Sequence, residues 1–188
     1  MPNPALTMKA LRARFDHDVR HAEAALIQDG CLAPMFAVTT GDGRLLPVMA
    51  DFGTPKAKQA CITAVRLLCI AEDAVMATHM AEAWLVVGEL VPGVSPGQSD
   101  RRVEAVLVSV NGRVGREVKC LSSVREILRG IDGRPSGLRP LALPGKKKGS
   151  QVDLGGPMSE LLPPQLPTRE QRLIAQVALE RMGLLKLA

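Results

Sequence analysis

The chain has 188 residues, enough for one compact domain with a hydrophobic core and too few for three. Hydrophobic residues make up 46% of it, which excludes an intrinsically disordered chain. Only 2% of the residues are aromatic, which excludes a nucleic-acid site that works by stacking bases, and the net charge of +5 favours phosphates or an acidic partner.

The chain has no run of about eighteen apolar residues, and its N-terminal residues lack the order of a secretory signal. We therefore expect a cytoplasmic protein with no membrane contact. The 4 cysteines form no Cys-x-x-Cys pair and have apolar neighbours, which indicates free, mostly buried thiols and no zinc site. They are Cys31, Cys61, Cys69 and Cys120.

A first helix is predicted over residues 5–28, because apolar residues recur at steps of three and four and Gly30 follows as a stop signal. It carries His17 and His21, close to the His-Glu-x-x-His spacing of zinc hydrolases. On a helix, however, this pair faces away from the apolar stripe, beside Arg14 and Arg20, which would repel a metal ion. We therefore predict a solvated helix face and no metal.

A β-hairpin and a second helix follow. Strands are predicted over 35–39 and 44–49, because two apolar runs flank Gly-Asp-Gly, a strong turn signal. The second helix is predicted over 54–71, with Thr54 as its N-cap and Pro55 at its first position.

The segment 74–90 has two interpretations, because its first part continues a helical pattern whereas its β-branched second part is typical of a strand. We place a strand within 76–89. As a strand it puts Glu82 and Trp84 on one face and His79 on the other, which leaves Glu82 among apolar residues, a setting that raises a carboxyl pKa. His79 and Glu82 are therefore a candidate buried polar site, and the structural alternative is a half-buried ion pair.

Two more strands and a short helix are predicted next. Residues 101–110 alternate as a strand, Asn-Gly-Arg at 111–113 is a hairpin signal, and another strand follows it. Residues 122–130 fit a short helix that ends at Gly130.

Residues 131–167 hold much of the proline and glycine and are predicted to form an extended arm or linker. Basic residues run along this region with few acids between them, a pattern that suits a phosphate backbone or an acidic protein surface; the alternative is a solvated linker. These candidate binding residues are Arg129, Arg134, Arg139, Lys146, Lys147 and Lys148.

A last helix is predicted from Thr168, because Gln171 three residues later completes a capping box. Its apolar face is predicted to consist of Ile174, Val177, Ala178 and Met182. This face either packs back on the domain or docks onto another subunit, so an oligomer through the helix is one expectation.

The elements add up to an α+β fold, an antiparallel sheet of about five strands with two helices packed on one face. The core is expected over 1–130, the arm over 131–167 and the C-terminal helix over 168–188. No nucleophile motif, phosphate-binding loop or dinucleotide fingerprint is present, so no catalytic residue and no cofactor is predicted.

Three classes of function fit these features. The first, which we expect, is a non-catalytic protein-interaction module, an accessory, inhibitor or assembly protein of the kind that phages and mobile elements encode. The second is a basic protein that binds the nucleic-acid backbone without sequence specificity through its arm. The third is an enzyme with an unrecognised site near Glu82.

Overall fold

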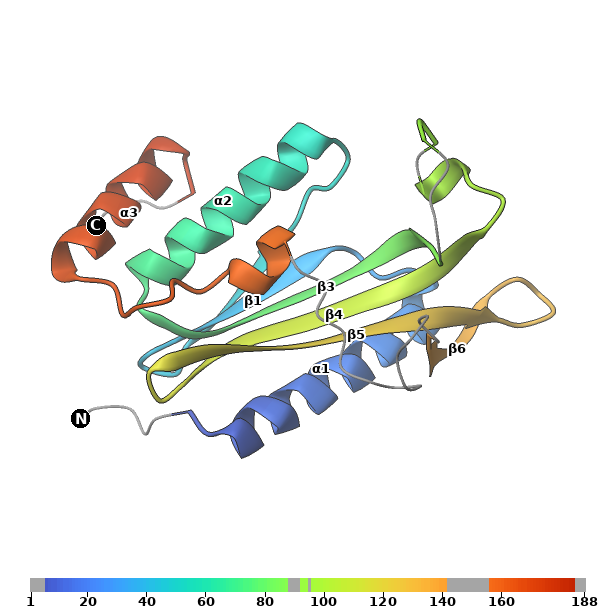
Figure 1. Cartoon of the computed structure of the whole chain (residues 1–188), viewed down its shortest axis with the longest axis horizontal. Coiled ribbons are helices and arrows are strands. Elements are labelled where there is room, and N and C mark those ends of the chain that lie inside the picture. The colour runs from blue at the N-terminus through green and yellow to red at the C-terminus, as the bar shows by residue number, and fades with distance from the viewer. Residues whose placement is uncertain (1–5, 88–91, 95, 142–155, 185–188) are drawn as a thin grey trace.

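A computed structural model describes residues 6–87, 92–94, 96–141 and 156–184 (Figure 1). The described helices are α1 (Met8–Asp29), α2 (Pro55–Ala71) and α3 (Arg169–Arg181). The strands are β1 (Met35–Thr40), β2 (Leu45–Met49), β3 (Ala74–Val86), β4 (Arg102–Val114), β5 (Glu117–Arg129) and β6 (Pro135–Pro140). Two short 3₁₀ turns, η1 (Pro96–Gln98) and η2 (Gly156–Glu160), lie in the connections.

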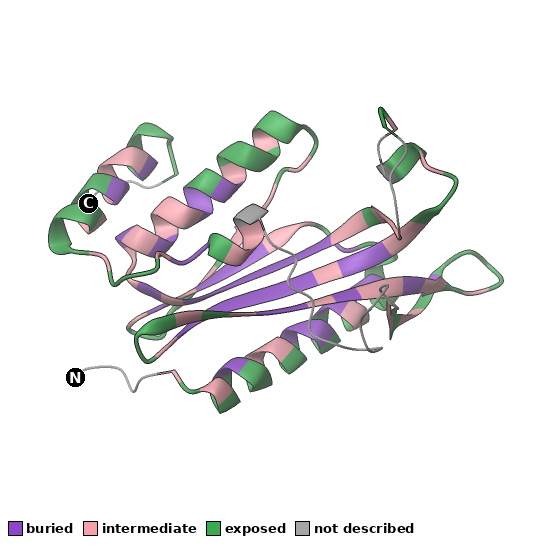
Figure 2. Cartoon of the chain, in the orientation of Figure 1, coloured by how far each residue is buried: buried purple, intermediate pink, exposed green. Residues whose placement is uncertain are grey.

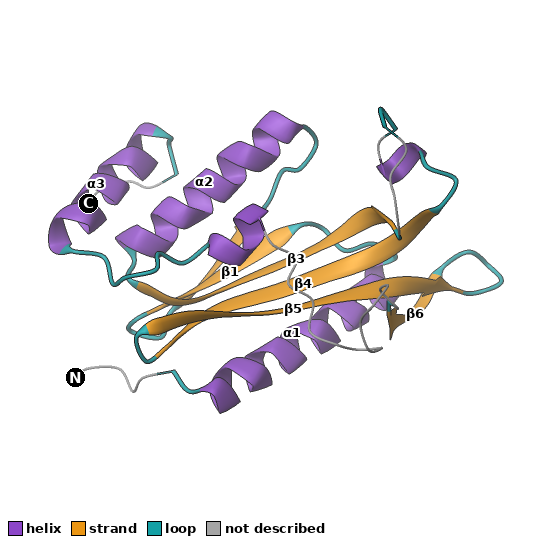
Figure 3. Cartoon of the chain, viewed as in Figure 1, coloured by secondary structure: helices purple, strands orange, loops and turns teal. Residues whose placement is uncertain are grey.

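The strands form one six-stranded antiparallel sheet in the order β2-β1-β3-β4-β5-β6. The α+β class, the antiparallel sheet and the two helices packed on it are confirmed, with one strand more than expected. Figure 3 shows the sheet between its helices.

The two sheet helices lie on opposite faces of the sheet, so the expectation that they share one face was wrong (Figure 1). On β3, Met76 and Met80 point to α1, whereas Ala77 points to α2. Figure 2 shows the central strands as buried along most of their length. The physical reason is that the central strands are apolar on both faces, and each face needs a cover.

The helix ends follow their capping residues. Thr54 caps α2 by accepting a hydrogen bond from the Ala57 N–H, and Gly30 ends α1 in the left-handed conformation at a φ of 77°. Thr168 and Gln171 form the predicted capping box of α3. These termini were predictable because capping is decided by residues close in sequence.

The β4–β5 hairpin turns at Gly115 and Arg116, so the turn predicted at 111–113 was wrong. Instead, β4 runs straight through Gly112. A Cβ at Gly112 would overlap the side chains of Leu11 and Leu6, so this glycine allows α1 to approach the sheet closely. Gly115, at a φ of 62°, supplies the left-handed conformation that the turn requires.

Residues 122–129 belong to β5, which ends just before Gly130, and β6 follows, so the short helix predicted over 122–130 was wrong. Strand β5 pairs with β4 on one side and with β6 on the other. These long-range ladders outweigh the local helical pattern. The first part of the predicted arm is therefore part of the sheet.

Helix α3 packs on α2 and not on the sheet (Figure 1). Small residues let the two helices approach, since Ala64 and Ala71 of α2 meet Ala175 and Leu179 of α3. Between η2 and α3, Leu161 and Leu162 are buried in the core under α2. No helix within the described residues is long and apolar enough to cross a membrane.

Candidate interaction surface

His79 and Glu82 lie on opposite faces of β3, as the strand interpretation predicts. His79 is 3% exposed and packs against the rings of Phe36 and Phe52, at centroid distances of 4.9 and 5.8 Å. Its Nε2 has no hydrogen-bond partner among the described residues. Burial, with the nearby charge of Lys58, lowers the pKa of His79 to about 4. His79 is therefore a neutral core residue at neutral pH.

Glu82 is half-buried on the face that α1 covers, and its carboxylate accepts a hydrogen bond from the backbone N–H of Leu32. The contact attaches the α1–β1 connection to β3. The structure does not bring Glu82 together with His79.

The buried acid of α1 is Asp18, which the sequence interpretation missed. It is 1% exposed, and its carboxylate accepts hydrogen bonds from Arg14 Nε and Thr78 Oγ1, each at 2.8 Å. The helix geometry contains the signal, because Asp18 falls two turns after Leu11 and one turn before Ala22, at the edge of the apolar stripe.

His17 and His21 are both exposed, as the helix geometry predicts, and their rings stack at 6.4 Å. His17 Nδ1 lies 3.1 Å from the Asp18 carboxylate. No group of three or more His, Cys, Asp and Glu side chains is placed to hold a metal ion in the described part of the chain.

The four cysteines are all free, but they are less buried than predicted. Cys69 is buried, and burial raises the pKa of its thiol to about 12. Cys61 and Cys120 are half-buried and Cys31 is exposed, which corrects the expectation of mostly buried thiols.

Two of the candidate basic residues are neutralised by acids. Arg129 Nε lies 2.7 Å from a Glu104 oxygen, and Arg139 binds both carboxylate oxygens of Glu126, at 2.8 and 2.9 Å. Arg134 is largely exposed, with Asp132 at 3.9 Å. The remaining three, Lys146, Lys147 and Lys148, lie outside the described residues, as does Leu143 of the predicted arm.

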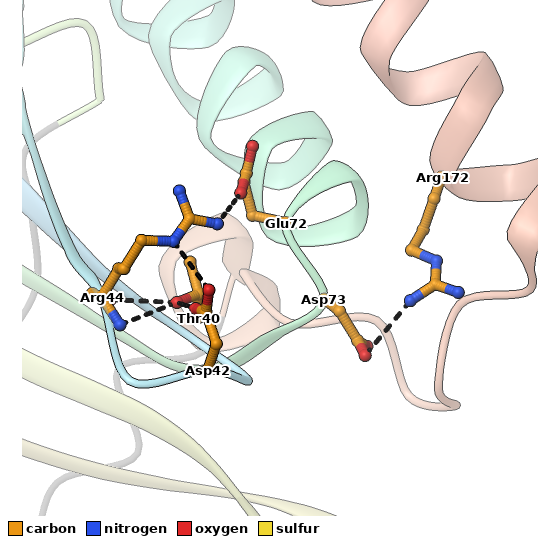
Figure 4. A network of polar contacts seen from close by, with 6 residues as sticks. All are labelled: Thr40, Asp42, Arg44, Glu72, Asp73 and Arg172. Atoms are coloured by element: carbon orange, nitrogen blue, oxygen red, sulfur yellow. Dashed lines mark hydrogen bonds and ion pairs between the residues drawn. The ribbon is translucent and has the colours of Figure 1, made fainter. Parts of the chain in front are cut away.

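A polar network at the C-terminal end of α2 fixes the neighbouring elements (Figure 4). Arg44 donates to Glu72 at 2.7 Å, which joins the β1–β2 turn to α2. Arg172 lies 3.3 Å from Asp73, which joins α3 to the same end. Hydrogen bonds from Thr40 and Arg44 lower the pKa of Asp42 to about 2. Each charged member is paired, so we interpret the network as a structural clamp.

The clamp and the α2 contact determine which face of α3 turns outward. Ala175 and Leu179 are buried against α2, whereas Leu173 and Ile174 are 57% and 61% exposed. The predicted face was wrong in this respect, since Ile174 and Met182 are both exposed. The reason is that the apolar residues of α3 are spread widely around the helix, and only the position of α2 selects the buried side.

A groove of about 400 Å³ lies beside this exposed face, between α2, α3 and the segment 163–168. Ile174 and Leu166 line it, and Leu166 is 64% exposed. We define the α3 surface as this groove together with Leu166, Leu173 and Ile174. The other residues that line the groove are Leu67, Ile70, Pro163, Pro164, Gln165, Pro167, Thr168, Gln171 and Ala175.

The wall of the groove formed by 163–165 is held by β4. The buried guanidinium of Arg113 donates to the carbonyls of Pro163, Pro164 and Gln165, at 2.6, 3.2 and 3.3 Å. Asn111 donates from Nδ2 to the Met158 carbonyl at 2.9 Å. Both residues lie in the segment that the sequence pattern assigned to a turn, so their role was missed. The groove is therefore preformed.

No protein-family model matches the chain, and neither a curated protein nor a solved structure matches it.

Proposed function

We propose that the protein is a non-catalytic protein-interaction module, an accessory, inhibitor or assembly protein, that binds an apolar helical segment of another polypeptide at the α3 surface. The observation that carries the proposal is the exposure of Leu166 and Ile174 on the wall of a groove that already exists, with exposed Leu173 next to Ile174 on α3. Exposed apolar residues gathered at a preformed groove are typical of a protein-binding site.

The edges of the sheet support a helix and not an added strand as the bound segment. Backbone hydrogen bonds join Thr40 N–H to the Arg44 carbonyl and Ala50 N–H to the Pro34 carbonyl. The even-numbered residues of β2 therefore direct their backbone groups toward β1. The odd-numbered residues direct theirs to the open edge, and there the backbone nitrogen of Pro47 carries no hydrogen to donate.

The opposite edge, β6, is also protected. The Leu138 N–H is taken by the Glu23 carboxylate of α1 at 3.0 Å. Strand addition needs free backbone groups along an edge, and both edges lack donors at central positions. We therefore favour a helix face, the α3 surface, as the binding mode.

The energy available is consistent with a reversible contact. Fully burying a Leu or Ile side chain contributes about 2 kcal/mol, and these three side chains are already partly covered, so together they contribute about 3 kcal/mol. Neighbouring contacts in the groove add to this. The surface therefore fits a regulated accessory contact better than a permanent one.

The test uses a photo-crosslinking residue in place of Ile174, in the full chain and in its native host. We expect one discrete covalent adduct, identified by mass spectrometry. A matched probe is placed at His21, which is exposed on α1. Because α1 lies on the opposite face of the sheet from α2 (Figure 1), we expect no adduct there. The purified partner then binds wild type, and Ile174→Asp weakens binding about tenfold or more, as expected for a central apolar contact.

Equal adducts at both probe positions would contradict the proposal. So would tight, salt-sensitive binding of a labelled DNA duplex that is lost when Lys146, Lys147 and Lys148 become Ala but unchanged by Ile174→Asp. That result would favour the basic arm as a nucleic-acid contact.

A further inference from the structure

The outward side of α3 carries opposite charges at its two ends. Glu170 lies in the first turn and Arg181 in the last. They are three turns apart, so they return to the same side of the helix within about 20°. Leu173, Ile174 and Val177 lie between them on that side. Glu170 and Arg181 thus flank an apolar centre, and the exposed Arg169 and Glu180 lie beside them at the margin of the stripe with the charges in the opposite order.

Both charged residues are open to a partner. Glu170 and Arg181 are exposed, and neither has an ion pair or a side-chain hydrogen bond among the described residues. In contrast Arg172, on the inward side, is paired with Asp73 (Figure 4). The clamp therefore holds α3 in one orientation, and in that orientation Glu170 and Arg181 point outward without a partner among the described residues.

This stripe is complementary to itself when two copies lie antiparallel. When a second copy lies antiparallel across it, each Glu170 meets Arg181 of the other copy, and the apolar centres face each other. A parallel arrangement would place Glu170 beside Glu170 and Arg181 beside Arg181 of the other copy, which is less favourable than the antiparallel pairing. We infer that the α3 surface binds a second copy of this chain, through an antiparallel pair of α3 helices related by a two-fold axis.

The neighbouring groove extends this contact. Helix α3 is about 20 Å long, so a pair of such helices alone covers less than the roughly 800 Å² per partner of a standard interface. Ile174 lies both on the stripe and on the wall of the 400 Å³ groove, with Leu166 at its rim. The copy that crosses α3 thus also reaches the groove, and we expect a dimer that dissociates in the micromolar range, as small interfaces do.

This inference rests on the proposed function, because it names the partner of the same surface. Sedimentation equilibrium of the full chain over a concentration series tests it. Wild type is expected to dimerise, Glu170→Arg and Arg181→Glu each to weaken the dimer about tenfold, and Ile174→Asp to abolish it. Arg20→Glu, an exposed charge change on α1, is the matched control and leaves the dimer intact.

Mixing the two single charge variants gives the sharpest readout. Alone, each variant places like charges opposite each other, but an equimolar mixture restores both attractive pairs across a heterodimer. We expect the mixture, and likewise the double variant E170R/R181E, to dimerise within about threefold of wild type. A variant that had merely lost helix α3 would not be rescued by mixing.

Wild type that stays monomeric at the highest concentration would overturn the inference. A dimer that ignores Ile174→Asp and both charge variants would also overturn it. If a different protein is crosslinked at position 174 while wild type stays monomeric, the proposed function stands and only the second copy as partner is wrong. If neither self-association nor a specific crosslink is found, both fail.

Discussion

Asp18, His79 and Arg113 are polar side chains buried between the layers of the fold, and each is accommodated in a different way. The carboxylate of Asp18 is paired with Arg14 and hydrogen-bonded to Thr78. The two terminal nitrogens of Arg113 donate to three backbone carbonyls. His79 has no such partner and is stable there only as the neutral imidazole.

The low pKa of His79 predicts a specific dependence of stability on pH. Burial lowers its pKa from 6.5 to about 4, so between these values the unfolded chain binds more protons than the folded protein. The contribution of His79 to the free energy of unfolding is therefore complete above pH 6.5 and is lost as the pH falls through 4. The total loss is about 3 kcal/mol.

Urea unfolding at pH 7 and at pH 4.5 measures this effect. Because carboxylates titrate in the same range, the comparison is with His79→Leu, which keeps an apolar side chain of similar size. On going from pH 7 to pH 4.5, we expect the free energy of unfolding of the variant to rise by about 2 kcal/mol relative to that of wild type. Parallel pH profiles for the two proteins would show that His79 is protonated without cost.

At the scale of elements, the contact of α1 with β4 depends on Gly112. A Cβ there would overlap the side chains of Leu11 and Leu6, and because Leu11 is fully buried, relieving the overlap requires its neighbours to repack. We expect Gly112→Ala to lower the free energy of unfolding by about 2 kcal/mol, measured by urea unfolding.

Gly137→Ala is the matched control for this prediction. Gly137 also lies in a strand, but its added Cβ would meet Glu23 at an ordinary 3.7 Å, so the change is expected to be neutral or slightly stabilising. Leu11→Ala should partly suppress Gly112→Ala, so that the double variant loses less than the two changes added together. Strict additivity would show that the overlap is not the cause.

The elements that the sequence predicted correctly are those specified by nearby residues. The caps at Thr54 and Thr168 and the turn between β1 and β2 depend on neighbours within a few positions. The assignment of 122–129 to a strand depends on pairing with β4 and β6, whose paired residues lie outside this segment. The α3 surface likewise depends on contacts outside the helix, because Ile174 is exposed only as a result of how α3 packs on α2.

At the scale of the whole molecule, the open edge of β2 is where we expect unwanted association to be suppressed. Pro47 sits at the outward position in the middle of this strand, and exposed Leu45 and Met49 flank it. Pro47→Val would restore an outward N–H and raise the β-propensity of the edge. We expect light scattering on mild heating to rise several-fold above wild type.

Pro55→Ala serves as the control, because it also removes a proline, at the first position of α2 where no strand can add. It should scatter like wild type. Unchanged scattering for Pro47→Val would show that the edge is protected by something other than the missing N–H.

The sequence by itself determined the α+β class, the helix termini and the outward direction of His17 and His21, because these follow from periodicity and capping. It also contained Asp18 at the edge of the apolar stripe. Only the tertiary structure decided that α1 and α2 cover opposite faces of the sheet and that Arg113 holds the segment 163–165. The same holds for the exposed side of α3, because its apolar residues are spread widely around the helix and no face is inward until α2 buries one.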